Sequence, residues 1–204
     1  MWSAAVGFRP HSGWTALVAV AVDRGAPVVL LRERVQLVAT FNYSFRQPYH
    51  TAARAGLEEG AAFIDQVEAD ASRLACDALR SVRDRLKKAG YRLMYAGLLQ
   101  GSARPLPSLG KILAAHPLIH TADGELFRRS LAHAATRIKL RSLRVREKEL
   151  LDLGAKTFRR RRNVLQRQLT ELGRPLGAPW SQDEKYAALV AWLALRSNRR
   201  SKST

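Results

Sequence analysis

Three short apolar runs divided by tight turns constrain the fold of this chain more than any other feature. Residues 2–8, 14–22 and 28–38 are rich in apolar and β-branched residues, and the breaks between them contain Pro10, Gly13 and Gly25. Runs of this kind, bounded by turn residues, predict consecutive β-strands. In the third run the alternate positions 29, 31, 33, 35 and 37 are mostly apolar, which predicts a half-buried edge strand.

A long helix and a buried strand follow. From Phe63 to Leu86 apolar residues recur at spacings of three and four, and Gly90 then provides a stop signal. Tyr91–Leu99 is almost continuously apolar, as expected of a central strand. The segment between the third strand and the helix, Phe41–Ala55, contains Pro48 and is predicted to be a loop.

The second half of the chain is predicted to be mainly helical, with one weak strand. The expected elements are a loop at 101–108, a short helix from the Ser108 cap to Ala115 that is ended by Pro117, a helix from Ala122 to Ile138 capped by Thr121, a strand at Ser142–Arg146, a helical stretch at Glu147–Leu172, a connector at Gly173–Trp180, and a last helix opened by the capping box Ser181–Glu184.

This order is strand, strand, strand, helix, strand, helix, strand, helix, helix. It is the element order of the ribonuclease H-like fold, an α/β fold in which a mixed sheet is flanked by helices. Right-handed crossovers would make the first, fourth and fifth strands parallel. We expect one such domain over residues 1–196 and a basic, disordered tail over residues 197–204.

The charge balance favours a polyanionic partner. Among 204 residues, 35 are Lys or Arg and 17 are Asp or Glu, which gives a formal net charge of +18. Such an excess attracts nucleic acid.

The single cysteine, Cys76, excludes an internal disulfide and falls in a helical apolar pattern, so it is expected to be buried. The chain starts without a basic signal region and the apolar run at 14–22 is too short to span a bilayer, so we predict a cytoplasmic protein without a membrane partner.

The basic residues gather in one segment between positions 137 and 167. A run of four arginines there, Arg159–Arg162, would cover one turn of a helix. Guanidinium groups match phosphate geometry. The predicted nucleic-acid-binding residues are Arg137, Lys139, Arg141, Arg144, Arg146, Lys156, Arg159, Arg160, Arg161, Arg162 and Arg167. The alternative is a solvated basic face without a fixed partner.

Both ends of the chain resemble a known family. The turn after the first strand, Val6-Gly-Phe-Arg-Pro-His-Ser-Gly-Trp14, resembles the opening of RuvC-type Holliday-junction resolvases, and Gly173–Leu195 resembles their Pro-rich link and final Asp-bearing helix. The resemblance implies carboxylates on several elements that hold two Mg²⁺ ions. In this chain Arg9 stands at the first-strand Asp, the fourth strand has no acidic residue, and only Asp183 and Glu184 stay in register. Most catalytic carboxylates of that family are therefore expected to be missing.

Several polar residues remain candidates for chemistry near the ends of the parallel strands. They are His11, Ser12, His120, Glu125 and Asp183. His11, His120, Glu125 and Asp183 could bind one transition metal, or His11 and Ser12 could act as base and nucleophile. Separate local roles in turns and caps are the alternative.

A further pair, His116 and His120, has the i, i+4 spacing of two ligands on one helix face. Pro117 directly follows His116 and argues against a continuous helix across this pair.

These observations lead to three functional hypotheses. The first is a nucleic-acid-binding protein on a ribonuclease H-like scaffold without standard two-metal catalysis. The second is a divergent nuclease that uses Mg²⁺ or Mn²⁺ held by Asp183, Glu184 and Glu125. The third is a basic scaffold that docks an acidic or ribonucleoprotein partner. The sequence does not distinguish DNA from RNA, and it leaves a homodimer open.

Overall fold

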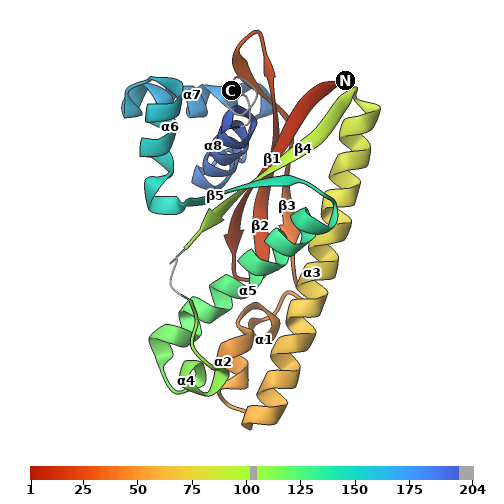
Figure 1. Cartoon of the computed structure of the whole chain (residues 1–204), viewed down its shortest axis with the longest axis vertical. Helices are drawn as coiled ribbons and strands as arrows, with labels where there is room; N and C mark the ends of the chain where they lie inside the picture. The colour runs from red at the N-terminus through yellow and green to blue at the C-terminus, as the bar shows by residue number, and fades with distance from the viewer. Residues whose placement is uncertain (102–104, 198–204) are drawn as a thin grey trace, which may run out of the picture.

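A mixed sheet forms the centre of the protein. The computed structural model describes residues 1–101 and 105–197, and within these ranges the sheet has five strands in the order β3-β2-β1-β4-β5 (Figure 1). The strands are β1 (Trp2–His11), β2 (Trp14–Asp23), β3 (Ala26–Gln36), β4 (Tyr91–Gln100) and β5 (Arg141–Arg146). All five predicted strands are confirmed.

The pairing of the strands also follows the prediction. β1, β2 and β3 form an antiparallel meander, and β3 lies at the sheet edge. β1 pairs in parallel with β4, and β4 in parallel with β5. Parallel neighbours require a crossover connection. Helix α3 (Leu57–Lys88) provides the crossover from β3 to β4, and α5 (His116–Arg137) lies in the crossover from β4 to β5.

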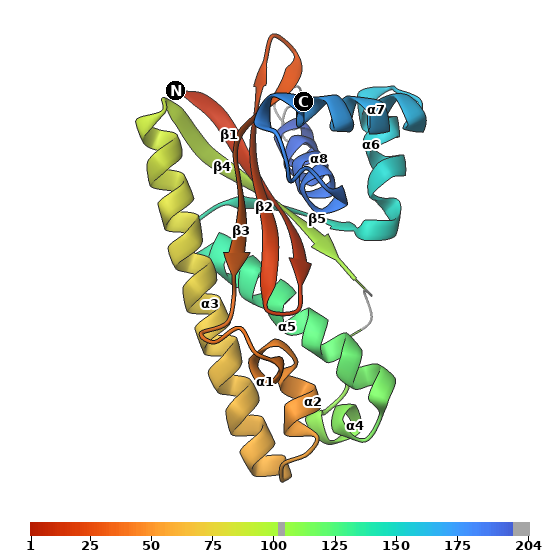
Figure 2. The ribbon, with the colours of Figure 1, turned by 180° about the vertical axis from the view of Figure 1, so that it is seen from behind.

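Helices cover both faces of the sheet, so the fold has three layers. α3 and α5 lie on one face, and α8 (Gln182–Ser197) lies on the other with α6 (Leu150–Phe158) and α7 (Arg162–Leu172) beyond it (Figures 1 and 2). Two apolar cores result. Phe8 and Leu17 pack toward α3 and α5, whereas Val18 and Val20 pack toward α8. Cys76 is buried in the first core, as predicted.

The backbone of α8 lies directly against the sheet at two glycines. Gly7 on β1 and Gly97 on β4 are register partners. A Cβ atom at Gly7 would lie 1.9 Å from the carbonyl oxygen of Ala187, and one at Gly97 would lie 2.4 Å from that of Val190. Since side chains are absent at these points, α8 packs closer to β1 and β4 than a helix normally can.

The predicted loop at Phe41–Ala55 is wrong in part, because two short helices lie there. These are α1 (Tyr43–Arg46) and α2 (Pro48–Ala52). Asn42 caps α1 by accepting a hydrogen bond of 3.1 Å from the Phe45 amide. Pro48 occupies the first position of α2, where the missing amide hydrogen does no harm.

The predicted helix break at Pro117 is also wrong. The preceding helix, α4 (Leu109–Leu113), ends before it, and α5 already begins at His116. Pro117 therefore lies in the first turn of α5, where its fixed φ favours the helix. Thr121 lies inside α5 rather than at its start, and its hydroxyl donates to the Pro117 carbonyl over 2.9 Å.

The helical stretch predicted at Glu147–Leu172 is broken in the middle. It contains a 3₁₀ turn (Glu147–Glu149), then α6 and α7. Arg159 adopts a left-handed conformation with φ 52°, and the Arg160 amide bonds back to the Ala155 carbonyl over 2.9 Å. This is a helix-ending motif usually built on glycine. The four arginines therefore do not form one helical turn.

The C-terminal part follows the prediction closely. The connector contains a 3₁₀ turn (Arg174–Leu176), and Arg32 of β3 donates hydrogen bonds to the carbonyls of residues 176–179. The predicted cap of α8 is present. The Ser181 hydroxyl accepts a hydrogen bond from the Asp183 amide, and the Ser181 amide donates a hydrogen bond to the Glu184 carboxylate. Ser197, predicted to start the tail, is the last residue of α8, and the rest of that tail lies outside the described residues.

Residues 102–104 of the predicted loop at 101–108 also lie outside the described residues. Among the described helices, none has the length and apolarity needed to cross a lipid bilayer.

The close approach of α8 predicts that Gly7→Ala is strongly destabilising. The new methyl group would collide with the Ala187 carbonyl, and overpacking against backbone lowers the free energy of unfolding by about 2 kcal/mol or more. Urea unfolding followed by circular dichroism measures this loss. Gly110→Ala is the matched control, because a Cβ atom there meets nothing within 4 Å. Equal stability of the two variants would contradict the proposed packing constraint.

Candidate functional site

An arginine lies between two carboxylates at the carboxyl end of β1. The Arg9 guanidinium bonds Glu147, with Nη2 2.6 Å from Oε1 and Nε 3.2 Å from both carboxylate oxygens. Its Nη1 atom forms a short ion pair with Asp183 Oδ1. Glu147 directly follows β5, and Asp183 lies in the first turn of α8. Three distant parts of the chain therefore meet at one cation.

The packing of α8 sets this geometry. Gly7, Arg9 and His11 lie on the same face of β1, because side chains alternate along a strand. Two strand residues advance about 6.6 Å, and one helical turn of four residues advances about 6 Å. The step from Gly7 to Arg9 along β1 therefore matches the step of one turn from Ala187 back to Asp183 along α8. The contact between Gly7 and Ala187 and the ion pair between Arg9 and Asp183 lie next to each other for this reason.

Arg9 is held in the charged form. Its hydrogen bonds to Glu147 raise the pKa of the guanidinium, burial acts in the opposite direction, and the contacts with Asp183 raise the pKa further. The Arg9 side chain is 18% exposed and that of Asp183 is 22% exposed, so water screens this pair less than a surface ion pair.

His11 extends the cluster by one further residue. Its Nε2 atom lies 3.0 Å from Asp183 Oδ1, and its ring stacks on Trp14 at a centroid distance of 4.2 Å. The neighbouring Ser12 uses its carbonyl to accept a bond from Arg46 Nε at 3.2 Å. In the described residues no hydrogen bond joins His11 to Ser12. The proposed base and nucleophile pair therefore has no direct link in this structure.

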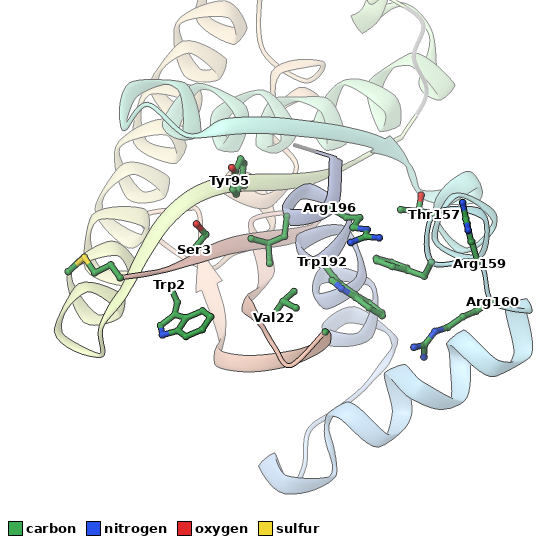
Figure 3. A pocket seen from close by; sticks show the side chains of 13 residues that line it. Trp2, Ser3, Val22, Tyr95, Thr157, Arg159, Arg160, Trp192 and Arg196 are labelled. Atoms are coloured by element: carbon green, nitrogen blue, oxygen red, sulfur yellow. The ribbon is translucent and has the colours of Figure 1, made fainter. Parts of the chain in front are cut away.

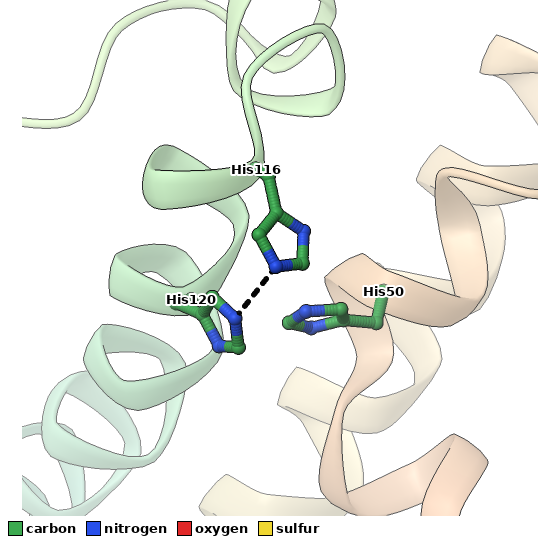
Figure 4. A group of neighbouring side chains, drawn as sticks. All are labelled: His50, His116 and His120. Atoms are coloured by element: carbon green, nitrogen blue, oxygen red, sulfur yellow. Dashed lines mark hydrogen bonds between the residues drawn. The ribbon is translucent and has the colours of Figure 1, made fainter.

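The other candidate residues lie in separate local contacts. His120 packs against His50 and His116 (Figure 4). Glu125 pairs with Arg128 on the same helix, with 3.2 Å between Oε1 and Nη1. Glu184 accepts from Ser181 in the cap of α8. The structure therefore brings His11 and Asp183 together and places His120, Glu125 and Glu184 in other contacts.

The predicted basic residues lie on the surface. All of the following are exposed: Arg137, Lys139, Arg141, Arg144, Arg146, Lys156, Arg159, Arg160, Arg161, Arg162 and Arg167. Within this set the described salt bridges join Arg146 to Glu149 and Arg162 to Asp152.

A pocket at the amino end of β1 combines aromatic and basic side chains. It has a volume of about 930 Å³. Trp2, Trp192 and three arginines, Arg159, Arg160 and Arg196, contribute to its lining (Figure 3). The Trp2 side chain is exposed, whereas Trp192 is buried and its ring stacks on Phe158 at a centroid distance of 3.6 Å, so Trp2 supplies the open aromatic face. Guanidinium groups and open aromatic faces are the groups that contact phosphates and bases.

Sequence reasoning missed two participants in these contacts. Glu147 appears in the sequence analysis only as the start of a predicted helical stretch, although its place directly after a predicted parallel strand is a signal for the strand-end edge. His50 lies in the segment predicted to be a loop, and no spacing in the sequence links it to His116 and His120.

Comparisons with known proteins identify the fold. The sequence matches no protein-family model and no curated protein. Among solved structures, the chain is similar to Thermus thermophilus RuvC in complex with a Holliday junction substrate, with a TM-score of 0.52 and 11% identity. It is also similar to another T. thermophilus RuvC structure, with a TM-score of 0.50 and 11% identity. Each comparison covers 97% of this chain and 96% of the other.

This likeness, together with the mixed five-stranded sheet of the described residues and its flanking helices, shows that the chain has the ribonuclease H-like fold seen in RuvC.

Proposed function

We propose that this protein binds nucleic acid on a ribonuclease H-like scaffold in which Arg9 takes the position of a catalytic metal centre. The observation that carries the proposal is the ion-pair cluster at the carboxyl end of β1, where one guanidinium joins Glu147 and Asp183. On this proposal the fold supplies a binding surface and no standard two-metal nuclease chemistry.

The residues of this cluster do not fit a pair of divalent cations. A hard cation needs several oxygen ligands, and here the two carboxylates already neutralise an arginine. Like any arginine, Arg9 is positive at every physiological pH, and Glu147 raises its pKa further, so Arg9 repels a divalent cation from the same place. β4 adds no carboxylate, because Tyr91–Gln100 contains no acidic residue.

The nuclease alternative would recruit Asp183, Glu184 and Glu125. Each of these carboxylates has another partner in the structure: Arg9 and His11 for Asp183, Ser181 for Glu184, and Arg128 for Glu125. Metal binding by this set would have to compete with all four of these contacts. This is the reason that we rank the nuclease second.

Support for a nucleic-acid partner comes from the surface. The net charge of +18 and the exposed arginines of β5 and of the junction between α6 and α7 form the kind of surface that attracts phosphates. One of the similar structures contains a Holliday junction substrate, so branched DNA is our first choice of ligand. A cytoplasmic location, a homodimer and the set of binding residues stay predictions.

The proposed function is tested by binding measurements with labelled four-way-junction, duplex and single-stranded DNA and with RNA, as salt titrations with and without Mn²⁺. We expect binding with a log–log salt slope of about −5, as neutralisation of six phosphates on duplex DNA would give. We expect no products of cleavage when Mn²⁺ is present. Cleavage that requires Mn²⁺ and is lost in Asp183→Ala would favour the nuclease instead.

Absence of nucleic-acid affinity at moderate salt would contradict the proposal and favour the third hypothesis. In that case the basic surface would dock an acidic or ribonucleoprotein partner.

The arginines of the large pocket provide a prediction with a matched control. Arg159→Ala combined with Arg160→Ala should weaken binding and reduce the magnitude of the salt slope by about 1.8, because each lost phosphate contact contributes about 0.9. Fluorescence anisotropy at several salt concentrations measures both quantities.

The control for this prediction removes the same charge from the opposite side of the sheet. Arg80 and Arg83 lie on α3, where they pair with Asp77 and Asp84. Arg80→Ala combined with Arg83→Ala should leave the affinity and the slope nearly unchanged. An equal loss in both double variants would show that total charge, rather than this surface, determines binding.

The role of Arg9 is tested by Arg9→Asp. This change removes the guanidinium and places a third carboxylate beside Glu147 and Asp183, so oxygen ligands for a divalent cation would converge. We expect the variant to bind Mn²⁺ in isothermal titration calorimetry, whereas the wild type and Arg9→Ala show no comparable heat. Mn²⁺ binding by the wild type that Asp183→Asn abolishes would overturn the assignment of Arg9.

A further inference from the structure

Three histidines from two helices face one another outside the cluster of Arg9. His50 comes from α2, and His116 and His120 come from the first two turns of α5 (Figure 4). Each offers one ring nitrogen, and these three nitrogens all lie within 4.8 Å of one another. In the described ranges of the chain, no other group of three His, Cys, Asp or Glu residues meets this criterion.

The local fold explains how the three rings meet. Because Pro117 is accommodated in the first turn of α5, His116 and His120 lie one turn apart on the same helix face. Their Nε2 atoms are 3.0 Å apart. α2 packs against α5 and brings the His50 ring to centroid distances of 5.3 Å from His116 and 4.4 Å from His120.

A buried carboxylate fixes the orientation of His50. Asp123 lies on α5, is 3% exposed, and has Oδ2 2.5 Å from His50 Nδ1. Its other oxygen, Oδ1, accepts a bond of 2.7 Å from the Tyr49 amide. Since Nδ1 of His50 is engaged by Asp123, Nε2 is the ring nitrogen that stays available for a metal ion.

This arrangement has the chemistry of a zinc site. Imidazole nitrogens are preferred ligands of Zn²⁺, which binds them at about 2.0–2.1 Å, so that nitrogens around a tetrahedral ion lie about 3.4 Å apart. The 3.0 Å between His116 and His120 is close to this value, and the distances to His50 lie within 4.8 Å, so side-chain rotations can bring the three nitrogens to it. A carboxylate that holds the second ring nitrogen of a ligating histidine is a common outer partner of such sites. His116 and His120 are exposed, so solvent can reach the fourth position.

We propose that His50, His116 and His120 bind one Zn²⁺ ion, with solvent as the fourth ligand and Asp123 as the residue that positions His50. The ion ties α2 to the start of α5. It therefore braces the helical part that extends beyond the sheet, which contains α1, α2 and α4 (Figure 1).

Zinc binding is measured on the full chain without a histidine tag, first stripped with EDTA and then titrated in competition with a chromogenic chelator. We expect one Zn²⁺ per chain and a rise in Tm on addition of Zn²⁺. Co²⁺ in place of Zn²⁺ should give the visible absorption of a tetrahedral ion with nitrogen ligands. Absence of any Zn²⁺ uptake would overturn the proposal.

Variants locate the ion. His116→Ala and His120→Ala should each abolish the Co²⁺ spectrum and the zinc-dependent rise in Tm, and Asp123→Asn should weaken binding by about 10–100-fold. His133→Ala is the matched control, because His133 is another exposed histidine of α5. Both His116 and His120 are exposed, so their alanine variants should fold, which circular dichroism without metal checks. Zinc binding that survives in the double variant of His116 and His120, or that His133→Ala weakens equally, would overturn the proposal.

Discussion

The contact between α8 and the paired glycines of β1 and β4 is the constraint on which the rest of this structure depends. Gly7 and Gly97 let the backbone of α8 approach the sheet, and residues 187–195 of the helix are buried as a result. The same approach determines the register of α8 along β1. One turn before the contact with Gly7, the helix presents Asp183 to Arg9. The packing of the core and the geometry of the polar cluster therefore have one common cause.

A guanidinium between two carboxylates gives this strand-end edge a different chemistry from that of a metal centre. Arg9 supplies one positive charge with directed hydrogen bonds, whereas a divalent cation supplies two charges and open coordination positions that can activate water. An arginine can hold the end of β5 and the start of α8 together, but it has no position at which water becomes a nucleophile. The edge is thus suited to holding the end of β5 and the start of α8 in fixed positions.

The group of His50, His116 and His120 shows why a candidate site can be recognised only in part from a sequence. The spacing of His116 and His120 is a local signal, but the expected break at Pro117 was wrong, because proline is harmful inside a helix and harmless in its first turn. His50 lies 66 residues before His116 in numbering and joins the group only through the packing of α2 on α5. Similarly, Glu147 meets Arg9 because β5 is parallel to β4 and ends at the same edge.

The sequence by itself determined the first four strands, the long helix α3 and the capped helix α8, which have clear apolar patterns, and it also located the weaker strand β5. It also determined that the first, fourth and fifth strands are parallel, because long helical crossovers in α/β folds are right-handed. Only the tertiary structure decided the break at Arg159, the pairing of Arg9 with Glu147 and Asp183, and the meeting of three histidines. The physical reason is that periodicity reports which face of an element is buried, whereas contacts between polar side chains depend on how distant elements pack against one another.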